Sequence, residues 1–158
     1  MSSTSTSSPS MPAASDRQTE RIMLKRLLRA GLLAAAFAAA GTMLIRTLAI
    51  AVGAVPENYQ PLQPGPVIAA PVIAALVATG VLATIARRVR RPIRAFRIVA
   101  GVGLLLSFSG PLQAGAGTMQ GGTASGATVT TMLLMHIVAA VIIVGLLTTI
   151  GREPQARI

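Results

Sequence analysis

The chain has 158 residues, with 14 lysines and arginines against four acidic residues and no cysteine. A formal charge of +10 would ordinarily indicate a nucleic-acid partner, but 53% of the residues are hydrophobic and only 3% are aromatic. The composition therefore argues against a soluble nucleic-acid-binding domain, and the lack of cysteine excludes disulfides and thiolate metal sites.

The N-terminal part of the sequence changes from polar to apolar. Residues 1–20 are rich in Ser, Thr, Pro and Ala, and we predict a disordered cytoplasmic tail because large apolar side chains are too few to offset the entropy of ordering. Residues 21–29 mix basic and large apolar side chains, which is typical of a helix that enters a membrane surface. Residues 27–55 form the first predicted span, an uncleaved anchor longer than the roughly 20 apolar residues that spanning requires.

Three further apolar segments predict three more spans. A loop with four prolines, residues 56–66, precedes the second span at 67–86, where Pro71 predicts at most a mild kink. The third span, 98–116, is less apolar at its far end, and the Gly-rich loop 117–126 leads to the fourth span at 127–150. We therefore predict a membrane domain at 21–151 and a short cytoplasmic tail at 152–158.

The basic residues predict the orientation of these spans. Five of them precede or start the first span and two follow the fourth. Six lie between the second and third spans: Arg87, Arg88, Arg90, Arg91, Arg94 and Arg97. Because the other two loops have none, the positive-inside rule places both termini in the cytoplasm. We expect the six arginines to orient the protein in a plasma membrane and to contact anionic lipid headgroups, and we expect no nucleic-acid partner.

Polar residues inside the spans are candidates for function. Arg46 lies near the outer end of the first span, where its long side chain can reach the headgroups; the alternative is an anion or lipid contact inside the bundle. His136 is the only histidine, and we expect it to form an interhelical hydrogen bond in a polar cluster with Ser107, Ser109 and Gln113.

A metal site at His136 is the alternative to that packing role. Met132 and Met135 lie beside His136 on the fourth span, and thioethers with imidazole suit Cu(I). Methionine also packs readily among Leu, Ile and Val without binding anything. We predict that the protein has no cofactor.

These observations predict an all-α integral membrane four-helix bundle. Small residues recur at packing distance in the spans, as in Gly31, Ala35 and Ala39, which favours close helix contact and is compatible with a homodimer. The sequence contains no G-x-S-x-G, H-E-x-x-H or P-loop pattern, so we predict that it is not an enzyme. The predicted function is a noncatalytic structural or accessory role through helix packing and lipid contact. The alternative is the handling of a small solute or metal by a polar cluster around His136.

Three stretches of the sequence carry a resemblance to a known family. They are "PLQPGPVIAAPVIAALVA" at 61–78, "RRPIRAFRIVAGVGLLLSF" at 90–108 and "TMLLMHIVAAVIIV" at 131–144. Over about residues 26–150 the chain resembles a family of small bacterial four-helix membrane proteins that is catalogued only as a domain of unknown function. The resemblance implies the four-span architecture and a bacterial source, and it assigns no catalytic or binding residue.

Overall fold

The computed structural model describes residues 14–89, 91–118 and 122–150. Their helices are α1 (Ala14–Ala51), the short 3-10 helix η1 (Gln60–Leu62), α2 (Pro64–Arg88), α3 (Pro92–Ser107), α4 (Ser109–Gly115) and α5 (Gly126–Ile150). The predicted tails at 1–13 and 152–158 and Arg90 lie outside the described residues. Residues 14–20, which we predicted as part of a disordered tail, are helical. Extending an existing helix avoids the cost of nucleating a new one, so this short polar stretch continues α1.

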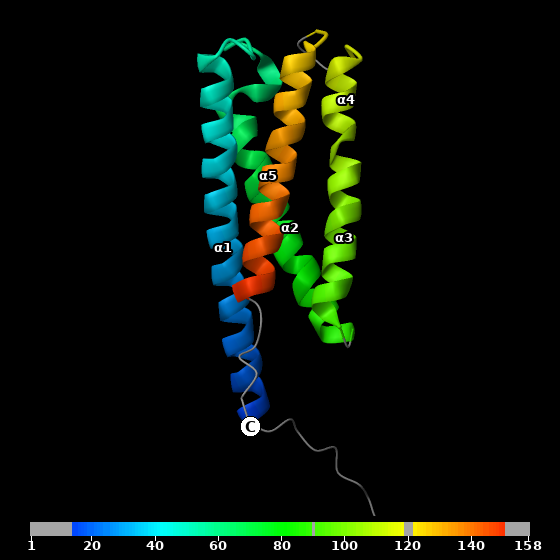
Figure 1. Ribbon diagram of the computed structural model, residues 1–158. Helices are drawn as coiled ribbons and strands as arrows, with labels where there is room; N and C mark the ends of the chain where they lie inside the picture. The colour runs from blue at the N-terminus through cyan, green and yellow to red at the C-terminus, as the bar shows by residue number, and fades with distance from the viewer. Residues whose placement is uncertain (1–13, 90, 119–121, 151–158) are drawn as a thin grey trace, which may run out of the picture.

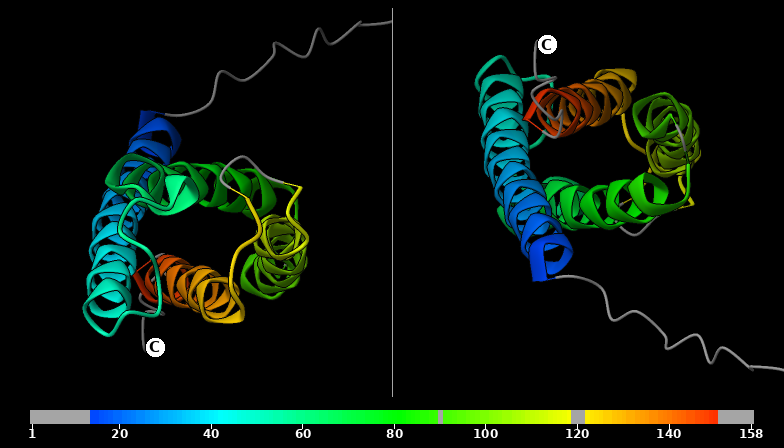
Figure 2. Two further views of the ribbon diagram at one scale, coloured as in Figure 1. Left: turned by 90° about the horizontal axis from the view of Figure 1, so that it is seen from above. Right: turned by 90° about the horizontal axis from the view of Figure 1, so that it is seen from below.

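Four helical columns run antiparallel around a common axis (Figure 1). Viewed along that axis, α1 lies opposite α3, and α2 and α5 form the two remaining sides (Figure 2). α1 packs along both α2 and α5, whereas α3 touches these two helices more sparsely and α4 packs on α5. The α2–α3 connection lies at the same end of the bundle as the last turn of α5 and the N-terminal part of α1.

Glycines at positive φ end two helices near their predicted ends. Gly53 has a φ of 70°, the Ala54 amide donates to the Ala49 carbonyl, and the Gly53 amide donates to Ile50. This pair of bonds is a Schellman motif, and it ends α1 at Ala51 even though apolar residues continue to 55, our predicted end. Gly117, with a φ of 72°, ends α4 with the same motif: its amide donates to the Ala114 carbonyl, and the Thr118 amide donates to the Gln113 carbonyl.

Small residues bring α1 close to its neighbours. Ala30, Ala34 and Ala38 recur every four residues and are fully buried. A Cβ atom on Gly31 would collide with the Thr79 side chain of α2, so these two helices are in contact at a position where only glycine fits. In lipid there is no hydrophobic driving force for helices to associate, so this close van der Waals contact holds α1 against its neighbours.

Pro71 lies inside α2 without ending it. Proline has no amide hydrogen, so the Val67 carbonyl one turn earlier loses its helical donor. The Thr42 hydroxyl of α1, which is buried, lies 3.2 Å from that carbonyl oxygen and can donate to it. The same hydroxyl is also 3.0 Å from the Ala38 carbonyl of its own helix. α1 therefore places a hydroxyl donor, shared with carbonyls of its own helix, beside the carbonyl that the proline leaves without its helical donor.

Pro111 has the opposite effect on the third column. We predicted one span at 98–116, but the helix begins at Pro92 and is interrupted at Phe108, so it comprises α3 and α4. Pro111 cannot donate to the Ser107 carbonyl one turn earlier, and its ring crowds that carbonyl, which accounts for the break. Pro92 is the first residue of α3, where a missing amide hydrogen costs nothing, so the helix can begin there. Arg94 and Arg97, which precede the predicted start at 98, therefore belong to the helix.

The outer surface of the bundle is apolar. Leu32, Leu44, Ile98, Leu105 and Leu106 are each at least 60% exposed. Four segments are long and apolar enough to cross a membrane: Lys25–Ala51, Pro64–Arg88, Pro92–Gly115 and Gly126–Ile150. A surface of this kind is stable against lipid chains and unstable in water. The structure thus confirms the predicted all-α fold with four potential spans.

The shared carbonyl of Val67 generates a prediction for two substitutions. Thr42→Val keeps the shape of the side chain but leaves the Val67 carbonyl without a donor, and we expect it to lower the free energy of unfolding by about 1 kcal/mol. Pro71→Ala restores the amide hydrogen of α2, so Thr42→Val should cost much less in that background. Unfolding of the four proteins in mixed micelles measures this coupling. Additive costs would show that Thr42 does not serve the Val67 carbonyl.

Candidate functional site

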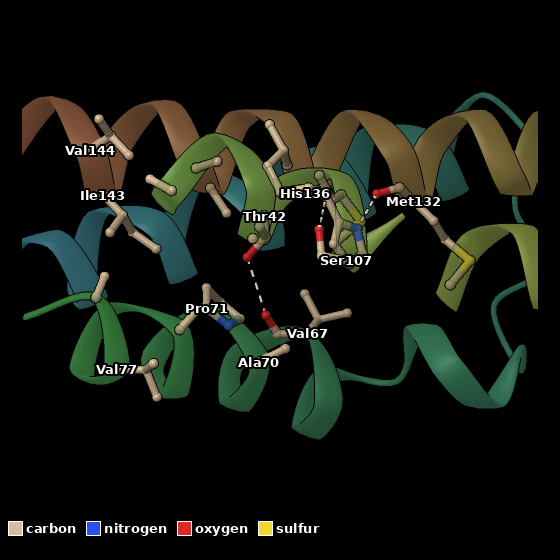
Figure 3. Close-up of a pocket in the computed structure, with 18 of the residues that line it drawn as sticks. Thr42, Val67, Ala70, Pro71, Val77, Ser107, Met132, His136, Ile143 and Val144 are labelled. Carbon is tan, nitrogen blue, oxygen red and sulfur yellow. Dashed lines mark hydrogen bonds between the residues drawn. The ribbon is translucent and has the colours of Figure 1, made fainter. Parts of the chain in front are cut away.

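A cavity of about 540 Å³ lies between α2, α3 and α5 (Figure 3). Thr42 of α1 and Leu62 of η1 also contribute to its wall. Binding sites for small molecules in proteins have volumes of about 300–1,000 Å³ and predominantly apolar walls. The walls here are built mostly of Ala, Val, Leu, Ile, Met and Pro, so both the size and the composition are those of a site for an apolar molecule.

The loose attachment of α3 creates this cavity. Phe96 is 1% exposed and is the buried residue that fixes the beginning of α3 to the core formed by the other columns. At the other end of the column, Pro111 and Ala114 of α4 are buried. Between these anchors α3 presents Ala100 and Gly103 to the cavity, and such small side chains leave the space beside them unfilled.

Three polar side chains line the cavity, and each is already engaged with a backbone carbonyl. Besides Thr42, Ser107 lies 2.7 Å from the Leu104 carbonyl oxygen, and the Nδ1 atom of His136 lies 2.7 Å from the Met132 carbonyl oxygen (Figure 3). A carbonyl oxygen can only accept, so Nδ1 carries a hydrogen and donates it. In the neutral ring the Nε2 atom is then an acceptor.

The structure brings together part of the predicted polar cluster. Ser107 and His136 line the same cavity from α3 and α5. Ser109 and Gln113 are exposed residues of α4 and do not belong to the wall. The break at Phe108 lies between them and Ser107. The bond of His136 described above lies within α5, whereas we had expected a bond between helices.

Met132 and Met135 also line the cavity beside His136, and both are buried. They belong to a packed cluster with Tyr59, Leu62 and Val67, among others, which occupies the end of the bundle nearest η1. Within the described residues no three His, Cys, Asp or Glu side chains gather as metal ligands. That finding does not extend to thioethers, so copper binding by the two methionines and His136 stays a prediction.

Arg46 binds the backbone of the connecting segment between α1 and α2. Its Nε atom donates to the Leu62 carbonyl at the end of η1, and the side chain is half-buried. A charge-assisted bond of this kind fixes the loop over the end of the bundle. Of the loop arginines, Arg87 and Arg88 close the last turn of α2, Arg91 precedes α3, and all three are exposed.

Sequence reasoning missed several residues of the site. Thr42 and Phe96 were not predicted as site residues, because threonine and phenylalanine are ordinary constituents of apolar helices. One signal was available for Thr42: Pro71 leaves the Val67 carbonyl without its helical donor, so a hydroxyl from another helix could have been sought.

Four long apolar helices around an internal cavity indicate a multi-pass membrane protein. The chain belongs to the family described as "Family of unknown function (DUF6069)", whose model matches residues 23–153. This match confirms the resemblance to a family of unknown function, and a bacterial source stays a prediction. No curated protein and no solved structure matches the chain.

The anchoring role of Phe96 predicts a large effect of its removal. Phe96→Ala deletes the buried side chain that holds α3, and we expect a loss of about 2 kcal/mol in the free energy of unfolding from lost contacts and enlarged space. Phe37→Ala is the matched control, because Phe37 is 58% exposed on α1 and should cost about 0.5 kcal/mol or less. Unfolding in detergent measures both. Equal costs would show that Phe96 does not anchor α3.

Proposed function

We propose that this protein is a noncatalytic accessory protein of a bacterial plasma membrane that holds an apolar molecule in the cavity beside α3. The observation that carries the proposal is the partly open cavity itself, because its size and apolar wall are those of a site for a small molecule. The occupant would complete the packing of α3, which the chain secures mainly at the two ends of that column.

The chemistry of the wall supports a binding role without catalysis. Among the described lining residues there is one histidine and no acidic side chain. A serine nucleophile is activated by a base within hydrogen-bond reach of its hydroxyl, and no hydrogen bond joins Ser107 to His136 among the described residues. Each of the two side chains is bonded to the backbone of its own helix instead.

The charge distribution supports an orientation with both termini in the cytoplasm. The end of the bundle that contains the α2–α3 connection has basic residues at Arg87, Arg88 and Arg91. In the described parts of the opposite end, Arg46 is the only basic residue. Basic residues are enriched on the cytoplasmic side of multi-pass proteins. Exposed arginines at that surface would also attract anionic headgroups, at about 1 kcal/mol for each residue.

The orientation can be tested with single cysteines, because the chain has none of its own. Asn58, in the connection between α1 and η1, and Val89, which follows α2, are both exposed and lie at opposite ends of the bundle. In intact bacteria a membrane-impermeant maleimide should label the Asn58→Cys variant, and it should label the Val89→Cys variant only after the cells are lysed. The reverse pattern would contradict the proposed orientation.

Blocking the cavity tests the proposed binding. An alkane that carries a photoreactive diazirine should label lining residues of the wild-type protein in nanodiscs, and this labelling should saturate as the alkane concentration rises. Gly103→Leu should reduce this labelling severalfold, since Gly103 lines the cavity and a leucine there would occupy part of the space open to the probe. Gly101→Leu makes the same change two residues away, outside the wall, and should leave the labelling unchanged. Non-saturable labelling, or equal labelling of both variants, would contradict a binding cavity.

A further inference from the structure

We infer that the cavity selects a neutral, single-chain amphiphile whose head group donates a hydrogen bond, such as a long-chain alcohol. This inference rests on the proposed function, and it names the class of molecule that the site would take. It follows from which hydrogen-bonding atoms the chain has used up and which it leaves available to a ligand.

The histidine presents an acceptor to the cavity. Its Nδ1 hydrogen is committed to the Met132 carbonyl at 2.7 Å, and a bond that short within a single helix fixes the tautomer and the position of the ring. The remaining ring nitrogen, Nε2, has no hydrogen-bond partner among the described residues. An acceptor in an apolar wall is unsatisfied until a donor reaches it, so a ligand with a hydroxyl or N–H group gains a bond there.

The two hydroxyl groups of the wall add acceptors and no donors. Ser107 uses its single hydrogen on the Leu104 carbonyl at 2.7 Å, and Thr42 uses its hydrogen on carbonyls of α1 and α2. Each hydroxyl oxygen retains lone pairs, but neither group has a second hydrogen to offer. A ligand head that only accepts, such as a ketone, an ether or an ester, would therefore find no donor among these side chains.

The wall also determines the charge of the ligand. None of the described lining residues is Asp, Glu, Lys or Arg, so neither a cationic nor an anionic head would be neutralised. His136 is the eleventh residue of α5, which has 25 residues, so the head would lie well inside the membrane. A charged group at that depth is costly without a partner, which restricts the ligand to neutral molecules.

The remaining wall accommodates an apolar chain. From His136 the cavity continues along α5 past Ala139 and Ala140 to Ile143 and Val144, a stretch without polar side chains (Figure 3). The total volume of about 540 Å³ lies within the range of sites for single small molecules. A single apolar chain with a small head fits both this volume and the position of the acceptors at one part of the wall.

The experiment compares two probes that differ only in the donor. A diazirine-bearing octanol and its methyl ether are added to the full-length protein in phosphatidylcholine nanodiscs at equal mole fractions in the bilayer. Labelled residues are then mapped by mass spectrometry. We expect the alcohol to label the lining residues about fivefold more than the ether, as one hydrogen bond in a membrane protein allows.

Variants of the acceptors connect this preference to the site. His136→Leu should bring the alcohol down to the level of the ether, and the ether itself should label as before. His136→Gln supplies an amide oxygen as acceptor and should retain part of the preference. Ser107→Ala should reduce it less than His136→Leu does. Circular dichroism and a monodisperse elution profile establish that each variant is folded.

The outcomes separate this inference from the proposed function. Equal labelling by alcohol and ether in the wild-type cavity would overturn the donor requirement and leave a binding cavity in place. Stronger labelling by the corresponding carboxylate, or occupancy by phospholipid that neither probe displaces, would also overturn it. If neither probe labels the cavity saturably, the proposed binding function fails as well.

Discussion

Close contact between α1 and its two neighbours is the constraint on which this structure depends. Lipid chains are as apolar as the side chains that face them, so association of the helices relies on van der Waals contact and on buried hydrogen bonds. Ala30, Ala34 and Ala38 provide that contact along α1, and Gly31 lets Thr79 approach the helix backbone. α3 has no comparable run of small buried residues. The bundle is therefore tight on three columns and loose on the fourth, and the cavity lies where the packing is loose.

Pro71 and Pro111 both lack an amide hydrogen, but only one of them interrupts its helix, and the difference lies in the packing around each. Each removes the donor for a carbonyl one turn earlier. At Pro71 the affected carbonyl faces α1, where the Thr42 hydroxyl reaches it, and α2 continues unbroken. At Pro111 the column is interrupted at Phe108. The tightly packed side of the bundle thus preserves a regular helix, and the loosely packed side does not.

The sequence predicted the four columns well, because length and apolarity are properties of each segment alone. Proline and glycine content predicted where the columns connect, but α2 begins at Pro64, inside the predicted loop 56–66, because proline is tolerated in the first turn of a helix. α1 ends four residues before the predicted end at 55 and α4 one residue before the predicted end at 116, since these ends depend on the positive φ of Gly53 and Gly117 and not on hydropathy. The site was predicted only in part. Depth in the membrane placed Ser107 with His136, but depth does not tell which side of a helix faces the cavity, and Gln113 is exposed outside it. The bond of Arg46 to Leu62 depends on how the loop folds back.

The arginines at the start of α3 have an electrostatic consequence for that helix. An α-helix carries roughly half a positive charge at its N-terminus, which disfavours cations in the first turns. Arg91, Arg94 and Arg97 nevertheless occupy this end of α3, whereas Arg87 and Arg88 lie at the favourable C-terminal end of α2. Anionic headgroups beside α3 would cancel this repulsion, so its first turns gain more from a membrane rich in acidic lipids than those of the other helices. The least firmly packed column is thereby also the one that begins with an N-cap arginine and has no acidic residue in its first turn.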